Sequence, residues 1–184
     1  QEALPDRTCS AGFLELTEPS VPDALETLWE QGFRRVTALP ALLMAAGHIK
    51  NDIPVIINAF QAEHPGLTIA LGRDLGVHPH LLQIAYERIE SIESTFGSDY
   101  DRHDTLLLVI GRGSSDPDAN SNISKITRIL WEGMGFGWTE VCYSGVAFPL
   151  VGPGLEHAVK LGYKRIIVFP YFLFTGILVK RIYE

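Results

Sequence analysis

The chain has 184 residues, and its 46% hydrophobic and 20% charged side chains are typical of a globular protein rather than a disordered or fibrous one. The formal net charge of −7 argues against a large basic surface for duplex nucleic acid. No apolar run reaches the roughly 18 to 20 residues of a membrane span, because the best stretch, 166–179, contains a proline and is followed at once by two cations.

Strands and helices are predicted to alternate along the first half of the chain. The predicted strands are 11–16, 35–39 and 67–71. The predicted helices are 21–31, 47–63 and 79–96. Gly32 is expected to end the first of these helices, and Pro79 to stand in the first turn of the last. This alternation predicts an α/β fold with parallel sheets and helices on both faces.

A polar stretch without apolar periodicity, 98–104, separates this half from the next. It is followed by a fully apolar strand, the glycine-rich turn GRGSSDPDAN and an amphipathic helix, which is how a new domain of this kind begins. We therefore expect two domains, 1–100 and 101–184.

The chain resembles itself at an offset of 130 residues. QGFRRVTALP (31–40) lies over LGYKRIIVFP (161–170), and without a gap Pro19 falls on Pro149 and Lys50 on Lys180. This repeat indicates a duplicated half-domain. By the offset, the front of the first copy would precede residue 1 and the back of the second would follow residue 184. We therefore expect a chain cut inside a domain at each end.

Ligand sites of such sheets lie at the carboxyl ends of the strands. The polar groups there that can bind a metal or move a proton are Glu15, Glu18, His48, Asp52, Asp116 and Asp118. In the second copy, Leu178 stands at the position of His48 and Gly145 at that of Glu15. Imidazole and carboxylate together suit divalent first-row metals, so the first copy is predicted to keep the chemistry while the second is scaffold.

Other motifs favour structural interpretations. The GRGSSDPDAN turn lacks the Lys-Ser/Thr of a phosphate loop, so a tight turn with Asp and Asn capping the next helix is the better interpretation. The two histidines of VHPH flank Pro79, which favours a helix start over a metal site. Cys9 and Cys142 match no zinc spacing and are predicted to be reduced, buried thiols of a cytoplasmic protein.

Four segments taken together, FLELTEPSVPDAL, LPALLMAAGHIKNDIP, GRGSSDPDAN and FPYFLFTGILVKRI, resemble the sirohydrochlorin chelatases. The resemblance is to the long, two-lobed cobaltochelatases, with the ferrochelatases of siroheme synthesis as close relatives. It implies two flavodoxin-like lobes related by duplication, with the active site in the cleft between them. Such enzymes insert a divalent metal, Co²⁺ or else Fe²⁺ or Ni²⁺, into sirohydrochlorin for cobalamin or siroheme biosynthesis. They use neither ATP nor an organic cofactor.

The resemblance also implies roles for individual residues. His48 is expected to be the main metal ligand and base, and Glu15 a second ligand or proton acceptor. The family's first histidine lies in a GHGS turn on a strand that this sequence does not contain, and Arg112 takes its place in the matching GRGS turn. Cations at strand ends are expected to hold the carboxylates of the tetrapyrrole. They are Lys50, Arg112, Lys180 and Arg181.

Two further hypotheses come from other functional classes. A flavodoxin-like module could hold a metal or a tetrapyrrole without turnover, and it would bind metal-free sirohydrochlorin but not metallate it. A flavin-binding electron carrier rests on analogy of fold alone and predicts a yellow protein. A homo-oligomer is a further expectation, because lobes cut at their ends would leave an apolar face uncovered.

Overall fold

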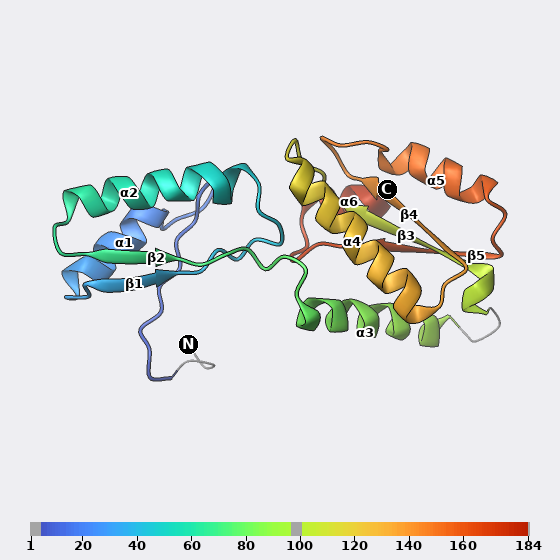
Figure 1. Ribbon diagram of the computed structural model, residues 1–184, viewed down its shortest axis with the longest axis horizontal. Helices are drawn as coiled ribbons and strands as arrows, with labels where there is room; N and C mark the ends of the chain where they lie inside the picture. The colour runs from blue at the N-terminus through green and yellow to red at the C-terminus, as the bar shows by residue number, and fades with distance from the viewer. Residues whose placement is uncertain (1–4, 97–100, 184) are drawn as a thin grey trace. The chain divides into compact units, whose positions relative to one another are not determined.

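The computed structural model describes residues 5–96 and 101–183, which fold into two compact units (Figure 1). Unit 1 contains residues 1–41 and 47–74, and unit 2 contains residues 42–46 and 75–184. Both units pair parallel strands and pack helices on them, which confirms the predicted α/β class. Among the described residues, no helix is both long and apolar enough to cross a membrane.

Unit 2 is built around a three-stranded parallel sheet with the strand order β4-β3-β5. The middle strand β3 (Thr105–Gly111) pairs with β4 (Trp138–Tyr143) on one side and with β5 (Arg165–Pro170) on the other. Every residue of β3 is buried. A parallel strand covered on both faces needs an uninterrupted apolar run, and TLLLVIG supplies it.

Helices cover both faces of this sheet. Leu107 and Val109 point to one face, where they form a core with α4 (Pro117–Met134) and α3 (Pro79–Thr95). The alternate residues Leu106 and Leu108 form a second core with α5 (Val151–Lys160), and α6 (Ile177–Tyr183) packs against it. The period-2 alternation of a strand thus distributes one apolar sequence between two cores.

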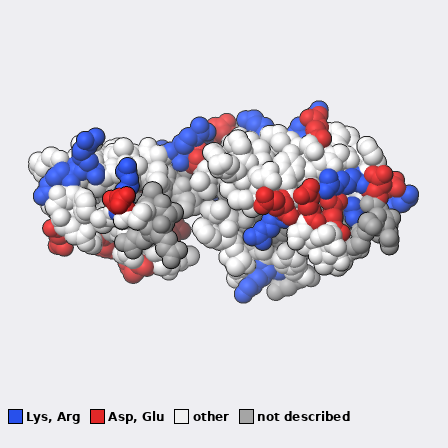
Figure 2. All heavy atoms as spheres, turned by 90° about the horizontal axis from the view of Figure 1, so that it is seen from below, with Lys and Arg blue, Asp and Glu red and all other residues white. Residues whose placement is uncertain are grey.

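A partly buried acid, Glu93, fastens α3 to the amino-terminal edge of the sheet. The Glu93 carboxylate accepts hydrogen bonds from Arg102, in the short 3-10 turn Arg102–Asp104, and from Arg165 at the start of β5. Arg165 also donates to the buried Thr105 hydroxyl at 2.9 Å. Figure 2 looks onto the side of the molecule that carries α3, where acidic and basic side chains adjoin one another on unit 2.

Unit 1 pairs two parallel strands, β1 (Arg35–Ala38) and β2 (Thr68–Leu71). Its helices are α1 (Val21–Glu30) and α2 (Ile53–Glu63), and a π-helical turn, η1 (His48–Asp52), leads directly into α2. A capping box between Ser20 and Asp23 starts α1. At the far end of α2, the His64 ring stacks on Phe60 and its Nε2 lies 3.2 Å from a carboxylate oxygen of Glu26, which ties α2 to α1.

The structure confirms the duplication at the level of the backbone. Helices α1 and α5 are related by the offset of 130 residues at both of their ends. Leu16 and Val146 both have left-handed backbones, with φ of 64° and 65°. The isolated parallel bridges Phe13↔Ser20 and Tyr143↔Leu150 are also equivalent. The peptide bonds before Pro19 and Pro149 are cis in both copies.

The strand predicted at 11–16 is wrong in its extent. Phe13 makes one bridge and the next residues form bends, whereas the counterpart of this segment is the full strand β4. The reason is pairing: β4 is held along its length by β3, and no described residue before Phe13 forms an equivalent strand. The lobe limits 1–100 and 101–184 stay a prediction, although α3 packs within unit 2.

Candidate functional site

His48 is the first residue of η1, the turn that follows β1 and opens α2. The His48 carbonyl accepts the amide N–H of Ile53, five residues on. Such π-turns are frequent at functional sites. The His48 side chain is 37% exposed, so part of the imidazole is accessible to solvent.

The neighbouring acid orients this imidazole. His48 Nδ1 lies 2.7 Å from Asp52 Oδ2, one helical turn further on. An ionised carboxylate can only accept a hydrogen bond, so Nδ1 carries the proton and the Nε2 lone pair is left for a cation. Asp52 is one of the polar groups expected at strand ends, but no role for it was predicted. The four-residue spacing from His48 is the signal that could have identified it.

Glu15 lies in the exposed loop 14–19, next to the left-handed Leu16. The counterpart loop, 144–149, follows β4, and the counterpart of η1 follows β5. Since β4 and β5 run parallel on either side of β3, their carboxyl ends lie at one sheet edge. This correspondence predicts that Glu15 and His48 lie at the same edge of unit 1, where the counterpart of β4 is reduced to the bridge at Phe13. Within 5–96 and 101–183, no group of three or more metal-binding side chains is formed.

The four predicted substrate-binding cations are all exposed, at the ends of strands or on the helices that follow them. Lys50 belongs to η1 of unit 1, whereas Arg112, Lys180 and Arg181 belong to unit 2. Among the described residues, the Arg112 guanidinium has no hydrogen-bond or ion-pair partner. It is therefore available to an anion.

The GRGSSDPDAN turn is closed by its own side chains. The Asn120 amide accepts from Ser114 N–H at 3.0 Å and donates to the Ser114 carbonyl at 2.7 Å. Asp116 caps α4 by accepting from the N–H of Asp118. Gly113 has φ of +85°, and a Cβ there would lie 1.9 Å from the Gly145 carbonyl oxygen. The capped tight turn is confirmed, and it packs directly against the loop 144–149.

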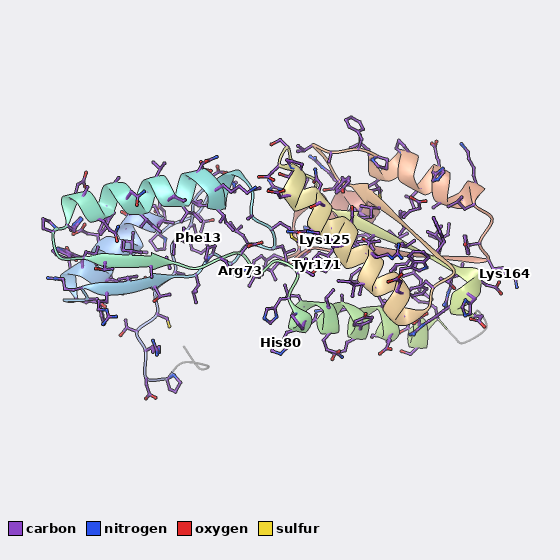
Figure 3. The ribbon with its side chains drawn as sticks, in the orientation of Figure 1. Phe13, Arg73, His80, Lys125, Lys164 and Tyr171 are labelled. Atoms are coloured by element: carbon purple, nitrogen blue, oxygen red, sulfur yellow. The ribbon has the colours of Figure 1, made fainter. Side chains whose placement is uncertain are left out.

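The VHPH motif is a helix start, as predicted. His78 caps α3 by accepting from the N–H of His80 at 3.2 Å, and Pro79 is the first residue of the helix. His80 projects from this end of α3 (Figure 3).

The prediction for the thiols is correct for Cys142, which is buried, and wrong for Cys9, which is exposed because the segment around it is not a strand. Burial raises the pKa of Cys142 to about 11.

Among the described residues, one buried side-chain oxygen, the Tyr171 hydroxyl, has no hydrogen-bond partner. Tyr171 follows β5 (Figure 3) and is 7% exposed. The same burial raises the pKa of Tyr171.

Comparison with known proteins places this geometry in context. The CbiX family profile matches residues 1–92 and 106–184. A sirohydrochlorin cobaltochelatase of Priestia megaterium is 41% identical over 172 residues, which are 94% of this chain and 56% of that protein. A sirohydrochlorin ferrochelatase of the same organism is 36% identical over 173 residues, 94% of this chain and 63% of that protein. The chain thus spans about three fifths of the length of these relatives.

Comparison with solved structures also finds sirohydrochlorin chelatases. SirB from Bacillus subtilis with Fe³⁺ superposes with a TM-score of 0.79 and 29% identity, over 94% of this chain and 66% of that one. The sirohydrochlorin chelatase SirB from Bacillus subtilis subspecies spizizenii, in complex with cobalt, gives a TM-score of 0.73 and 27% identity. That match covers 94% of this chain and 63% of that one.

Proposed function

The chain belongs to the CbiX family, and on this premise we propose that it inserts a divalent metal into a sirohydrochlorin-type tetrapyrrole. Co²⁺ is the first candidate, because the cobaltochelatase relative is 41% identical and the ferrochelatase relative 36%. Fe²⁺ is an alternative, since one relative is a ferrochelatase and a SirB structure is described with Fe³⁺. Ni²⁺ is a further alternative on ligand chemistry alone, because imidazole and carboxylate also suit it. The reaction would be that of a lyase without ATP or an organic cofactor, in cobalamin or siroheme biosynthesis.

The observation that carries the proposal is the His48–Asp52 pair. With Nδ1 held by Asp52 at 2.7 Å, the neutral imidazole offers Nε2 to the incoming metal. Glu15 is proposed as the second ligand, because a carboxylate can both hold the metal and accept a proton. Insertion exchanges two pyrrole protons for one divalent cation. A base next to the metal therefore takes part in both halves of the exchange.

The proposed substrate contacts are electrostatic. A net charge of −7 would repel a polycarboxylate unless cations meet it locally. Arg112 is the strongest candidate, because its exposed guanidinium can bind a carboxylate through two parallel hydrogen bonds. Lys50, Lys180 and Arg181 are proposed to meet further carboxylates. The proposal keeps residues 1–100 as the lobe with the metal ligands and residues 101–184 as the second lobe.

The test is the visible absorption of sirohydrochlorin with Co²⁺ under anaerobic conditions, with and without the chain. The chain is expected to accelerate metal insertion, and His48→Ala to reduce the rate to that without protein. The matched control is His80→Ala, which removes another exposed imidazole and should leave the rate unchanged.

Two outcomes would overturn parts of this proposal. Normal insertion by His48→Ala would refute the ligand assignment. Binding of metal-free sirohydrochlorin without any acceleration of metallation would show the non-catalytic binding module instead of the enzyme.

A further inference from the structure

The loop 144–149 of unit 2, called the apolar loop below, exposes large apolar side chains. Val146 is 71% exposed and Phe148 is 81% exposed. Cys142 and Tyr143, which end β4 immediately before the loop, are buried. The loop therefore exposes apolar side chains to solvent at the carboxyl edge of the sheet, although the core next to it is buried.

The conformation of the apolar loop is costly, and both copies of the repeat have it. Val146 has φ of 65°, a region that β-branched residues rarely adopt, and Leu16 has φ of 64° at the equivalent position. Leu16 is also fully exposed. Neither side chain is held in this conformation by packing of its own. Retained strain of this kind is common at ligand-binding sites.

The backbone around the apolar loop is firmly built. Ala147 N–H donates to the Gly145 carbonyl at 2.7 Å, and Tyr143 N–H donates to the Pro149 carbonyl at 2.8 Å. Gly113 fits against Gly145 so closely that any side chain there would collide with the loop. The loop therefore presents Val146 and Phe148 from a fixed frame.

A cation, Arg112, stands beside this surface. Arg112 directly precedes Gly113, and the Ser144 hydroxyl donates to the Arg112 carbonyl at 3.2 Å. The guanidinium is exposed and makes no hydrogen bond or ion pair with any described residue. Gly145 stands where the first copy has Glu15, so the apolar loop itself supplies no counterpart of that carboxylate.

We propose that the apolar loop and Arg112 form a docking site for the tetrapyrrole that takes no part in binding the metal. This inference rests on the proposed function. Val146 and Phe148 would contact the flat apolar face of the ring, and Arg112 would pair with one of its peripheral carboxylates. A polycarboxylate macrocycle combines an apolar face with an anionic rim, which matches both halves of the surface. A second copy of the same loop would bring two Arg112 cations together, so it is the poorer match.

The experiment measures the affinity of the chain for metal-free sirohydrochlorin by absorption titration, with no metal present. Phe148→Ser is expected to weaken binding about tenfold, which corresponds to losing the free energy of burying roughly half of an aromatic side chain. Arg112→Met is expected to weaken it about fivefold and to reduce its dependence on salt, while Arg112→Lys restores part of the loss. The matched control is Phe96→Ser, because Phe96 is 77% exposed at the end of α3 in the same unit.

The outcomes separate this inference from the proposed function. Binding by Phe148→Ser within twofold of the unchanged chain, or an equal loss in Phe96→Ser, overturns the docking site even if metal insertion proceeds. A selective loss in Phe148→Ser supports the docking site even if the chain metallates nothing. If Phe148→Ser converts a dimer to a monomer in sedimentation and leaves ring binding intact, the loop is a contact between copies and the inference is overturned.

Discussion

Replacing Glu93 by Gln should destabilise unit 2, because it removes the carboxylate charge that two arginines share. Glu93 Oε2 lies 2.7 Å from Arg102 Nη2 and 3.0 Å from Arg102 Nε, and Oε1 lies 2.9 Å from Arg165 Nη2. The side chains of Glu93 and Arg165 are 14% and 15% exposed. The hydrogen bonding of Arg102 to the Glu93 carboxylate, which accepts from it, is the main reason that the pKa of Arg102 is raised.

The size of the effect follows from burial. Breaking a buried ion pair from one side costs about 3–5 kcal/mol, because the remaining charge has no partner. Arg102 is a third exposed and keeps a 3.5 Å contact with Glu90, so part of its charge stays solvated and paired. We therefore expect Glu93→Gln to lower the free energy of unfolding by about 2–3 kcal/mol, scaling down the buried-pair value. That corresponds to a decrease in Tm of roughly 5–10 °C for a chain of this size.

The assay is urea and thermal unfolding followed by circular dichroism, with Glu90→Gln as the control. Glu90 lies on the same helix and contacts the same arginine, but its side chain is 60% exposed, so its loss should cost less than about 1 kcal/mol. Equal destabilisation by the two variants would refute the reasoning. A double-mutant cycle that combines Glu93→Gln with Arg165→Met isolates the contribution of the Glu93–Arg165 contact to the free energy of unfolding.

Further predictions concern four side chains. Asp52→Asn should weaken Co²⁺ binding to the chain about tenfold in a metal titration, because the carboxylate that orients His48 is lost. At pH 8, maleimide should label the exposed Cys9 rapidly and Cys142 only after unfolding. The pKa of Cys142 is raised from 9.0 to about 11, so its contribution to stability is complete below pH 9 and is lost as pH rises toward 11. Tyr171→Phe should leave the Tm unchanged or raise stability by up to about 1 kcal/mol, because it removes a buried hydroxyl that has no partner among the described residues.

Each of these predictions has a contrary result. Unchanged Co²⁺ affinity in Asp52→Asn would show that the aspartate does not act through His48. Rapid labelling of two thiols in the folded chain would contradict the burial of Cys142. A loss of more than about 1 kcal/mol in Tyr171→Phe would mean that the hydroxyl has a partner in solution.

Much of this protein follows from local sequence. The alternation of apolar strands with amphipathic helices predicted α/β units, and the offset of 130 residues predicted a duplication that is reproduced in α1 and α5. The Asp116 cap and the helix start at Pro79 also followed from residues adjacent in the chain. These features depend on backbone preferences and hydrogen bonds within a few residues, so the sequence contains the information directly.

The tertiary structure decided what depends on distant partners. The segment before Phe13 is the counterpart of β4 but has no neighbouring strand in the described chain, so Cys9 is exposed, whereas Cys142 in β4 is buried. Helix α3 joins unit 2 through Glu93 and Arg165, which lie 72 residues apart. The position of the exposed apolar loop beside Arg112 depends on the packing of Gly113 against Gly145, which lies 32 residues further along the chain. A strand is stable only with a partner and a buried charge only with a counter-ion, and sequence neighbours supply neither.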